Sequence, residues 1–574
     1  MSTTDKTYDV VVVGLGPTGL TLAHLLGRRG LSVLVLEREP KFYGNARAVY
    51  TDDEAMRVFQ TAGVADEVHA DMNLDCAVQW VRSDGDVMIQ FLPTKQTLGW
   101  PVVNFLYQPT LENTLEELLD RYAHVEVLRA RELVDFTQDP DGVSVVHAAS
   151  TGTSYGESAG VVDETTTQTV RARYLVGADG GRSLVRARLG SEMTGKSFPE
   201  RWLVVDLAAK EGVDAFGHRP YFDFICDPVR PTVSCPQPGR RHRFEFALTD
   251  QDDKEHFEAE ATVRQLLSRH VDPNDVMVLR RLVYTFNALV ADRWRDRRVL
   301  LAGDAAHMTP QFVGQGMNAG IRDADNLSWK LQAILRHGAD PAILDSYQSE
   351  RAPHAKAMID FSVVNKSLVS VKHPARAKAR DAAMWAVLRT PGLAGYVRNM
   401  GMKPKPKYPK GAYLGLARGF RGVEGTLAPQ TTVRTYDGRL VRLDDALGLG
   451  WAVIGIGVDP RQVLGKDVET WERVDASFAT LHAAGERPQG KAVEQLRAQC
   501  VVDLEDITGA LTSWQRRAGA KQGSVLVLRP DKYVFGVSDG HTHELTRALA
   551  AQLGLRQPAL PAPTRAKVGS HPVT

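Results

Sequence analysis

Three glycines near the N-terminus have the spacing of a phosphate-binding turn: Gly14, Gly16 and Gly19. The β-branched run 10–13 precedes them, as in a buried strand, and the apolar segment 20–26 has the period of a helix. A turn without side chains lets the backbone approach a pyrophosphate, whose charge then lies at the N-terminus of the helix. The pattern predicts a dinucleotide site, and a purely structural glycine turn is the alternative.

Glu37 and Asp304 narrow the choice of dinucleotide. Glu37 ends the second apolar run, 32–36, where its carboxylate can bind ribose hydroxyls, and a glutamate there disfavours a 2′-phosphate. Asp304 follows Gly303 after a third apolar run, 298–301, where it can accept hydrogen bonds from a polyol chain such as ribityl. A helix cap is the alternative for Asp304. Because a ribityl chain belongs to a flavin, this residue favours FAD over NAD.

A second helix start follows Asp304 along the chain. Pro310 precedes the glycine-rich run 314–318, which opens a helical pattern that continues through Leu331. Three backbone N–H groups at this start would carry partial positive charge, those of Gly316, Met317 and Asn318. A reduced flavin carries its negative charge at the N1/C2 carbonyl edge, which such a helix start would stabilise. An enzyme that binds only NAD has no need of this second site.

Other patterns of acid–base or metal chemistry are not evident in the sequence. We find no Ser-His-Asp arrangement and no metal-ligand spacing. His307 follows Gly-Asp-Ala-Ala, where a packed structural histidine is favoured over a catalytic base. The four cysteines form no C-x-x-C pair, which argues against a disulfide framework or a zinc site and is typical of a reducing compartment.

Length and composition limit the class of protein. The chain has 574 residues, which suggests about three domains, and its 43% hydrophobic and 24% charged residues are ordinary for a globular protein. A formal net charge of +1 gives no electrostatic case for a nucleic-acid partner. The N-terminus is polar and acidic rather than signal-like, and Gly14 interrupts the first apolar stretch well short of a membrane span. We therefore expect a cytoplasmic protein without a membrane partner.

Three apolar runs end at glycine-rich turns with an acidic residue nearby: 10–13, 174–176 and 298–301. These junctions are far apart in sequence, yet parallel strands would bring them to one sheet edge. The segment 202–249 instead alternates strand-like runs with turns, as in an antiparallel sheet. We expect an α/β fold in which a Rossmann-like FAD-binding domain is interleaved with an antiparallel-sheet substrate domain. The expected bounds are 1–75, 100–190 and 280–370 for the FAD-binding domain, and 76–99 and 191–279 for the substrate domain.

The last third of the chain is predicted to form a separate unit. Residues 371–410 are expected to be a helical segment and a linker, since 403–410 alternates lysine with proline and would be stiff and extended. Trp451–Gly455 and Ser524–Leu528 read as strands of a C-terminal α/β domain, 411–555. The proline-rich end, 556–574, is expected to be disordered.

Several motifs together resemble the class A flavoprotein aromatic hydroxylases. Three of them correspond to that family's fingerprints: Gly14 to Gly19, Asp179-Gly180-x-x-Ser183-x-x-Arg186, and Gly303-Asp304 with Gln315-Gly316-x-Asn318. Further stretches are similar to the 3-(3-hydroxyphenyl)propionate hydroxylases: 52–55, 226–231, 243–246, 347–351 and 354–360. The likeness covers most of residues 8–415, and the C-terminal region resembles the thioredoxin-like domain of related hydroxylases, without its C-x-x-C.

The resemblance implies roles for further residues. Arg47 and Gln108 match an arginine and a glutamine that contact FAD in the family, although Ala46 stands where relatives often have proline. Asp179, Gly180 and Arg186 match the middle motif, which is implicated in FAD and nicotinamide use; a surface ion pair is the alternative for Arg186.

The resemblance also implies a reaction. NADH or NADPH would reduce bound FAD, O2 would form a flavin C4a-hydroperoxide, and one oxygen atom would enter a phenol ring ortho to its hydroxyl. The expected product is the 2,3-dihydroxyphenyl derivative of 3-(3-hydroxyphenyl)propionate, in aromatic catabolism. A polycyclic polyketide hydroxylase and a non-catalytic FAD-binding protein are the alternatives. A homodimer is an expectation from the family only.

Recognition of a propionate tail would require a cation and hydrogen-bond donors. The candidates on the expected substrate sheet are Tyr221, Arg230 and Arg243, each of which could equally be structural. Phe224 could line the pocket, although core packing is the alternative.

Overall fold

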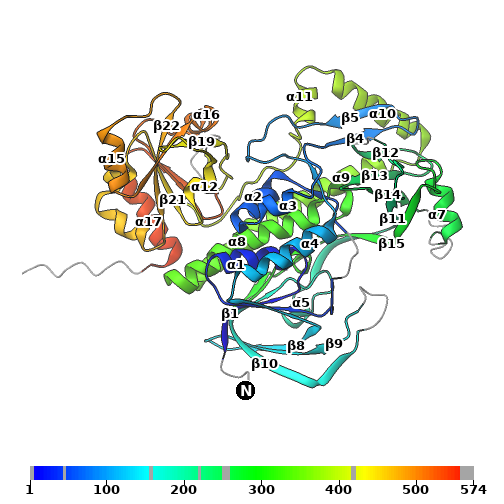
Figure 1. Ribbon diagram of the computed structural model, residues 1–574, viewed down its shortest axis with the longest axis horizontal. Helices are drawn as coiled ribbons and strands as arrows, with labels where there is room; N and C mark the ends of the chain where they lie inside the picture. Colours follow the sequence, from blue (N-terminus) through cyan, green and yellow to red (C-terminus); the bar gives the residue numbers. More distant parts are fainter. Residues whose placement is uncertain are drawn as a thin grey trace, which may run out of the picture.

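The computed structural model describes residues 6–42, 47–153, 160–217, 221–248, 257, 259–414 and 422–555. Over these residues the chain is mixed α/β, with two sheets of eight strands, one of seven and a two-stranded pair. Figure 1 shows the arrangement: the N-terminal sheet lies at the bottom, the second sheet at the upper right, and the C-terminal unit on the left. The predicted disordered tail, 556–574, lies outside the described residues.

The N-terminal sheet combines strands that are far apart in the sequence. Its central path runs β16-β17-β10-β1-β2-β7, and β8 and β9 extend it beside β10. These strands are β1 (Thr7–Val13), β2 (Val33–Glu37), β7 (Val125–Arg129), β8 (Arg131–Gln138), β9 (Val143–Ser150), β10 (Val162–Gly177), β16 (Arg295–Asp296) and β17 (Val299–Leu301). β1 pairs in parallel with both β2 and β10, and β10 with β17. The ends of these strands therefore meet at one edge, as the three junctions predict.

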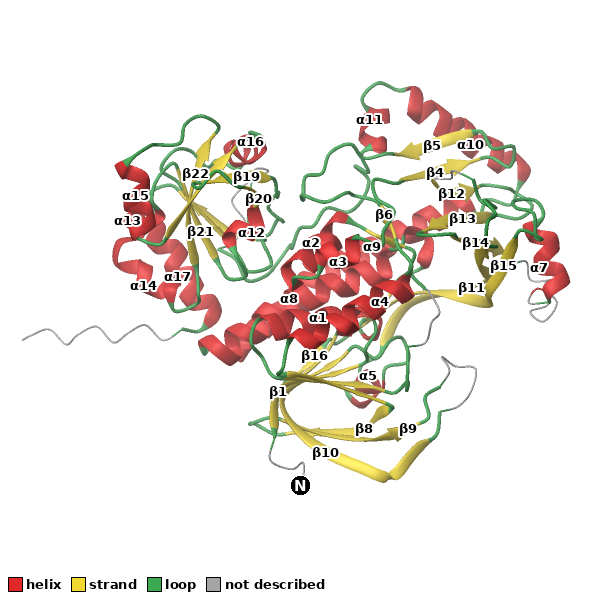
Figure 2. Ribbon diagram, in the orientation of Figure 1, coloured by secondary structure: helices red, strands yellow, loops and turns green. Residues whose placement is uncertain are grey.

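Helices cover this sheet on the side that faces the other two units (Figure 2). The long helix α8 (Gln315–His337) lies against α1 (Pro17–Arg28), and the remaining elements here are β3 (Tyr50–Thr51), α2 (Asp53–Ala62), α3 (Ala65–His69), β6 (Asn104–Phe105), α4 (Gln108–Glu117) and α5 (Leu184–Arg188). Close approach of α1 and α8 depends on glycine: a Cβ at Gly320 would lie 2.1 Å from Oγ1 of Thr18. None of the described helices combines the length and apolar character needed to cross a membrane.

The second sheet has the order β18-β15-β11-β14-β13-β12-β4-β5. Its strands are β4 (Ala77–Val81), β5 (Val87–Phe91), β11 (Met193–Ala209), β12 (Tyr221–Ile225), β13 (Thr232–Gln237), β14 (Arg241–Ala247), β15 (Val276–Ala291) and β18 (His307–Met308). The expectation of a wholly antiparallel sheet is wrong at one place, because β12 and β4 pair in parallel. β4 enters from the N-terminal unit rather than through a hairpin, so hairpin geometry does not fix its direction.

Three helices connect this sheet to the C-terminal unit: α9 (Asp345–Val369), α10 (Pro374–Arg389) and α11 (Leu393–Arg398). The lysine- and proline-rich segment that follows is anchored to the protein at Lys403 and Tyr408, while Lys405, Lys407 and Lys410 are exposed. The side chain of Lys403 is only 9% exposed and pairs with carboxylates, and Tyr408 is buried. Ion pairs with carboxylates distant in the sequence thus hold Lys403 in place.

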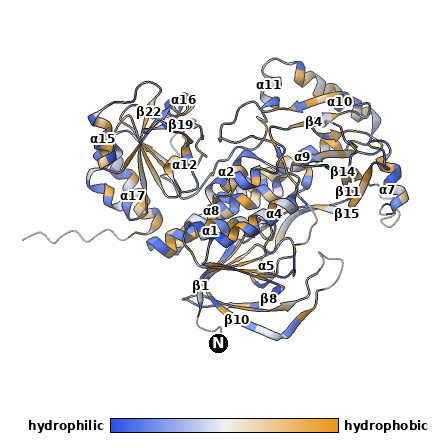
Figure 3. Ribbon diagram, viewed as in Figure 1, coloured by the Kyte–Doolittle hydropathy of each residue, from blue (hydrophilic) through white to orange (hydrophobic). Residues whose placement is uncertain are grey.

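The C-terminal sheet has the order β20-β19-β23-β22-β21-β24-β25. Its strands are β19 (Thr432–Thr435), β20 (Leu440–Arg442), β21 (Ala452–Ile456), β22 (Ser477–Ala483), β23 (Val501–Asp506), β24 (Val525–Leu528) and β25 (Val534–Ser538). Helices α12 (Leu443–Leu447), α13 (Pro460–Leu464), α14 (Val468–Glu472), α15 (Lys491–Ala498), α16 (Ala510–Arg517) and α17 (Thr542–Leu553) surround it. Both strands predicted from the sequence, β21 and β24, are present, and Figure 3 shows the apolar strands at the centre of the unit.

A buried polar interface fixes the C-terminal unit to the N-terminal one. Glu350 on α9 accepts hydrogen bonds from both terminal nitrogens of Arg529, at 2.7 and 2.9 Å, and from Nζ of Lys330 at 2.8 Å. Arg57 on α2 forms a bidentate pair with Asp444, at 2.6 and 2.9 Å. Breaking such buried pairs is costly, so the two units are expected to behave as one body.

Candidate functional site

The glycine turn at the end of β1 has the geometry of a ligand cradle. Gly14 has φ +102°, and a Cβ there would lie 2.4 Å from the carbonyl oxygen of Ala178, so no other residue fits without displacement. A Cβ at Gly19 would lie 2.0 Å from the carbonyl oxygen of Gly14. A Cβ at Gly16 would meet nothing within 4 Å, which leaves open space in front of the α1 N-terminus. That space and the uncapped helix start fit a pyrophosphate.

Glu37 lies at the end of β2 beside this turn. Its Oε2 accepts a hydrogen bond from the backbone N–H of Leu15 at 2.7 Å, and its Oε1 accepts one from Glu39 at 2.9 Å. These bonds fix the carboxylate next to the turn, and each oxygen retains a lone pair for a ribose hydroxyl.

Gly303 and Asp304 lie where β17 meets α1 and α8. Gly303 has φ +61°, and a Cβ there would lie 2.5 Å from Oγ1 of Thr18. The side chain of Asp304 is 38% exposed, and its Oδ2 lies 3.9 Å from a terminal nitrogen of Arg47. Asp304 is therefore accessible to a ligand that runs along the edge of the sheet, as a ribityl chain would.

Gln108 supports the segment that carries Arg47. Its Oε1 accepts hydrogen bonds from the backbone N–H groups of Arg47, at 2.7 Å, and Ala48, at 2.6 Å. The amide oxygen is thus engaged within the protein, and Gln108 positions the arginine. Residues 43–46, which precede it, lie outside the described residues.

The middle motif has a similar supporting arrangement. Asp179 accepts a hydrogen bond from the hydroxyl of Ser183 at 2.5 Å, and burial raises the pKa of its carboxyl. Arg186 donates to the carbonyl oxygens of Gly181, at 2.7 Å, and Ala305, at 3.1 Å. Arg186 therefore joins the middle motif to the turn that carries Asp304. Gly180, with φ +78°, has open space around its Cβ position.

The start of α8 is held by several side chains. Gly314 has φ +59°, and the amide nitrogen of Asn318 donates to its carbonyl oxygen at 2.7 Å. Pro310, just upstream, is fixed by the hydroxyl of Ser362, which donates to its carbonyl oxygen at 2.7 Å. A Cβ at Gly316 would have its nearest neighbour at 3.9 Å, so this first turn of the helix is open on one side. The free N–H groups there suit an anionic ligand edge.

An ionic cluster that the sequence did not reveal lies behind this helix start. We call Asp52, Glu54, Arg322 and Lys403 the α8 clamp. Lys403 Nζ lies 2.9 Å from Asp52 and 2.8 Å from Glu54, and Arg322 contacts the same two carboxylates. Arg322 also donates to the side-chain oxygen of Gln315, the first residue of α8, at 3.1 Å. Arg322 and Lys403 outweigh the effect of burial and hold the pKa of Asp52 below its usual range.

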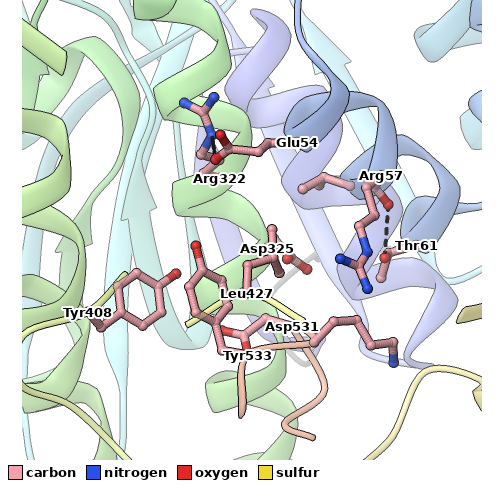
Figure 4. A pocket seen from close by; sticks show the side chains of 11 residues that line it. Glu54, Arg57, Thr61, Arg322, Asp325, Tyr408, Leu427, Asp531 and Tyr533 are labelled. Carbon is pink, nitrogen blue, oxygen red and sulfur yellow. Dashed lines mark hydrogen bonds and ion pairs between the residues drawn. The ribbon is translucent and has the colours of Figure 1, made fainter. Parts of the chain in front are cut away.

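A small cavity of about 20 Å³ lies beside the clamp, between α2, α8 and the C-terminal unit. Figure 4 shows Arg322 and Glu54 at one side of it, and Asp325, Asp531, Tyr408 and Tyr533 around the rest. It has room for roughly one water molecule and not for an aromatic substrate. This cavity belongs to the interface between the units and not to the edge that carries Gly14 and Asp304.

His307 is a packed structural group, the reading that the sequence favours. Its Nε2 lies 2.7 Å from Asp323, which also pairs with Arg351 at 2.8 Å. All three side chains are fully buried, so His307 is not placed to exchange protons with a bound substrate.

One face of the second sheet is directed towards the N-terminal unit. Directly opposed residues share a face of a sheet, and successive residues alternate between faces. Arg243 donates to the carbonyl oxygen of Arg47 at 2.7 Å, and the guanidinium of Arg241 lies 4.2 Å from the ring centroid of Tyr107, so this face contacts the N-terminal unit. We call it the inner face. Its other members include Phe222, Phe224, Val233, Cys235, Gln237, Trp202, Asp206, Glu245, Tyr284 and Phe286.

An aromatic wall joins the inner face to the segment between Pro310 and α8. Phe312 lies 5.1 Å from Trp202, 4.9 Å from Phe286 and 6.5 Å from Phe224, measured between ring centroids. Phe224 is thus on the expected face, but it is buried among other rings. This wall can exclude water from a reaction at the start of α8.

The polar residues of the inner face form one connected group. Arg243 is buried and forms a bidentate pair with Asp206, at 2.6 and 3.0 Å. Tyr284 donates to Glu245 at 3.0 Å, and burial raises the pKa of both side chains. Arg243 already has a carboxylate partner in the protein, so its charge is largely compensated.

The other two substrate candidates lie elsewhere. Tyr221 alternates with Phe222 and so belongs to the opposite face of β12. Arg230 donates to the carbonyl oxygen of Ala247 at 2.9 Å and lies over the ring of Phe257, a member of the apolar cluster on the far face. Neither side chain is directed towards the N-terminal unit.

Comparisons with known proteins identify the family of this chain. Residues 7–362 match the FAD binding domain family, and residues 425–552 match the HcaD C-terminal domain. The chain therefore belongs to the FAD-dependent aromatic hydroxylases, which are flavoprotein monooxygenases, and FAD is its cofactor.

Within that class its relatives include proteins named 3-(3-hydroxy-phenyl)propionate/3-hydroxycinnamic acid hydroxylase. The 3-(3-hydroxy-phenyl)propionate/3-hydroxycinnamic acid hydroxylase 2 of Burkholderia vietnamiensis is 35% identical, with 92% of this chain and 94% of the relative covered. An Escherichia coli protein of the same activity name is 34% identical, with 96% of each chain covered.

Solved structures share the fold over nearly the whole chain. Aklavinone-11 hydroxylase with FAD and aklavinone has a TM-score of 0.73 at 22% identity, covering 96% of this chain and 99% of the other. The flavin-dependent monooxygenase PieE, with FAD and substrate, has a TM-score of 0.77 at 21% identity and the same coverage.

Proposed function

We propose that this enzyme hydroxylates a phenol ortho to its hydroxyl group, with NADH or NADPH as reductant and O2 as oxidant, and that the phenol carries a carboxylated side chain, as 3-(3-hydroxyphenyl)propionate does. The observation that carries the proposal is the 34–35% identity to hydroxylases of that name across more than nine-tenths of the chain. The aromatic wall with its connected polar group supports a small phenolic ligand.

The residues at the sheet edge would bind FAD. The Gly14–Gly19 turn and the start of α1 would hold the pyrophosphate, Glu37 the ribose and Asp304 the ribityl chain. Arg47 would contact the cofactor; Gln108 fixes the backbone of Arg47, and Arg186 fixes the turn that carries Asp304. The N–H groups of Gly316, Met317 and Asn318 would face the N1/C2 carbonyl edge. Bound FAD, once reduced, supplies the chemistry that activates O2.

The remaining residues would act on the substrate. The rings of Trp202, Phe286 and Phe312 would orient the phenol and exclude water, which protects a reactive oxygen species from hydrolysis. Glu245 is buried beside Tyr284, so this pair can receive a hydrogen bond from the phenol hydroxyl and hold its proton. Transfer of the proton from the phenol hydroxyl to this pair leaves negative charge on the oxygen, which raises the electron density of the ring carbon ortho to it.

We also infer a thioredoxin-like fold for the C-terminal unit. The strand order β22-β21-β24-β25, with the first pair parallel and the others antiparallel, supports it. The residues after β21 are Gly457-Val458-Asp459-Pro460, where a redox-active member would have C-x-x-C. The unit therefore acts structurally, through its interface with Glu350 and Arg57.

The test is consumption of NADH and of NADPH by the purified protein, with and without 3-(3-hydroxyphenyl)propionate. Catechol product and hydrogen peroxide are quantified in the same reactions. We expect strong stimulation with matching catechol. Stimulation that yields mainly peroxide would reject this substrate and favour a larger one such as a polyketide, which the fold shared with aklavinone-11 hydroxylase permits. Flavin that no nicotinamide cofactor reduces, with or without the phenol, would favour a non-catalytic FAD-binding protein.

A further inference from the structure

A buried amide on the inner face has no partner within the described protein. Gln237 is the last residue of β13 and is 2% exposed, and neither its Oε1 nor its Nε2 has a hydrogen-bond partner among the described residues. Leaving one such group unsatisfied costs about 1–3 kcal/mol. Buried polar groups are nearly always satisfied, so an amide with both ends open indicates a ligand or water.

The register of the sheet places a cation beside this amide. Gln237 is directly opposite Arg241 on β14, so the two side chains start on the same face with Cβ atoms about 5 Å apart. The guanidinium of Arg241 packs over the Tyr107 ring and donates weakly to the carbonyl oxygen of Pro238, at 3.4 Å. No carboxylate among the described residues forms an ion pair with Arg241.

The charges around this pair favour an anion. Arg243 and Arg280 face Asp206, and Glu245 lies nearby, so within the inner face these two cations are matched by two carboxylates. Arg241 adds one positive charge in excess. A charge-assisted hydrogen bond from a guanidinium to a carboxylate is among the stronger polar contacts, and a neutral amide N–H can supply a second donor.

We propose that Gln237 and Arg241 form a subsite for the carboxylate of the substrate's side chain. The Arg241 guanidinium and the Gln237 Nε2 would donate to the carboxylate. The subsite and the Glu245–Tyr284 pair belong to one strand region: Arg241 and Glu245 are four residues apart on β14, about 13–14 Å between Cα atoms. Arg243, which lies between them on this face, is directed to Asp206 and to the backbone of Arg47, and a phenol ring with a three-carbon tail would span from the Glu245–Tyr284 pair to Arg241.

This inference rests on the proposed function and names different residues from the sequence candidates. Arg230 lies on the far face and Arg243 is paired with Asp206, whereas Arg241 is on the inner face and forms no ion pair with a carboxylate among the described residues. The sequence could not distinguish these arginines, because only strand register decides which of them faces the N-terminal unit.

The test compares a carboxylated phenol with a neutral one in the FAD-loaded enzyme. Dissociation constants for 3-(3-hydroxyphenyl)propionate and 3-ethylphenol are measured from the perturbation of flavin absorption. In the Arg241→Gln variant we expect the constant for the carboxylated ligand to rise about tenfold or more, and that for 3-ethylphenol to change less than about twofold. Gln237→Leu should also weaken binding of the carboxylated ligand selectively, by a smaller factor than Arg241→Gln. Gln237→Glu should weaken it more than Gln237→Leu does, because the glutamate places a like charge beside the carboxylate.

Arg240→Gln is the matched control. Arg240 is exposed, is one residue away in the same hairpin, and donates to the carbonyl oxygen of Lys210 at 2.8 Å. Arg240→Gln removes the same charge as Arg241→Gln but from outside the subsite, so it should leave the ratio of the two dissociation constants unchanged. An equal loss for both ligands in Arg241→Gln, or a wild-type enzyme with no preference for the carboxylated ligand, would overturn the subsite and leave only water at Gln237.

Failure of the subsite can be told from failure of the proposed function. If wild-type enzyme forms catechol from the carboxylated phenol and both variants keep the binding preference, the reaction stands and the subsite is wrong. If the preference is present and both variants lose it, but no catechol forms, the carboxylate subsite stands and the proposed substrate is wrong.

Discussion

Replacing Lys403 by methionine should weaken both the fold and FAD binding. The side chain is 9% exposed, and its ammonium lies 2.9 Å from Asp52, 2.8 Å from Glu54 and 3.7 Å from Asp53. Removing one partner from a buried ionic cluster costs about 3–5 kcal/mol. Arg322 remains against two of the carboxylates, so the lower end applies, and the free energy of unfolding should fall by about 3 kcal/mol at neutral pH.

The effect should reach FAD through the first residue of α8. Asp52 and Arg322 both bind the side chain of Gln315, so a disturbed clamp displaces the N–H groups that would face the flavin. Urea unfolding followed by tryptophan fluorescence gives the stability, and titration of the apoprotein with FAD gives the affinity, which should fall as well. Lys403→Arg, which retains the charge, should recover most of both losses.

Lys405→Met is the control for this experiment, because Lys405 is exposed and two residues away. It should unfold at the same urea concentration as the wild type. The reasoning would be refuted if Lys403→Met also unfolded at that concentration and bound FAD equally well, since the clamp would then contribute nothing to either property.

Three further predictions concern the residues that would bind FAD and a buried carboxyl group near them. Gly16→Leu should change the unfolding free energy of the apoprotein by less than about 0.5 kcal/mol, because a Cβ there meets nothing within 4 Å. It should abolish FAD binding, because the leucine side chain would fill the space of the ligand. A variant apoprotein that still binds FAD would contradict the site. Asp304→Ala should weaken FAD binding about ten- to hundredfold by fluorescence titration, and unchanged affinity would remove Asp304 from the site. Burial raises the pKa of Glu112 to about 7, from an ordinary value near 4.5, so its contribution to stability is complete below pH 4.5 and is lost as the pH rises through 7. In Glu112→Gln the free energy of unfolding, measured with urea, should therefore fall less between pH 4.5 and 7 than in the wild type. An equal fall in both proteins would show that Glu112 is not the group that titrates.

Much of the local structure at the candidate cofactor site could be predicted from local sequence. The order of strand, glycine turn and helix at Gly14–Gly19 recurs in the structure, as do the strand ending at Glu37 and the helix starting after Gly314. Each depends on short-range rules of turn and helix formation. The C-terminal strands β21 and β24 were also predicted, because apolar β-branched runs identify buried strands without knowledge of their partners.

The residues of the inner face could not be predicted in the same way. Tyr221 and Gln237 are both on strands of one sheet, but a shift of one residue moves a side chain to the other face. The sequence shows the residue types, while the register depends on pairing between strands that are distant along the chain. The parallel pairing of β12 with β4 is an example, since all the elements from β5 to β11 lie between these two strands in the chain.

By itself, then, the sequence determined the glycine turn, the acidic residues that end the strands and the start of α8, because each is specified within a few residues of backbone. Only the tertiary structure decided that Lys403 closes a clamp with Asp52, 351 residues earlier, and that Arg241 rather than Arg230 faces the N-terminal unit. The physical reason is that burial and the choice of ionic partner are properties of the packed chain: the same lysine is solvated in an extended segment and buried when carboxylates from a distant helix meet it.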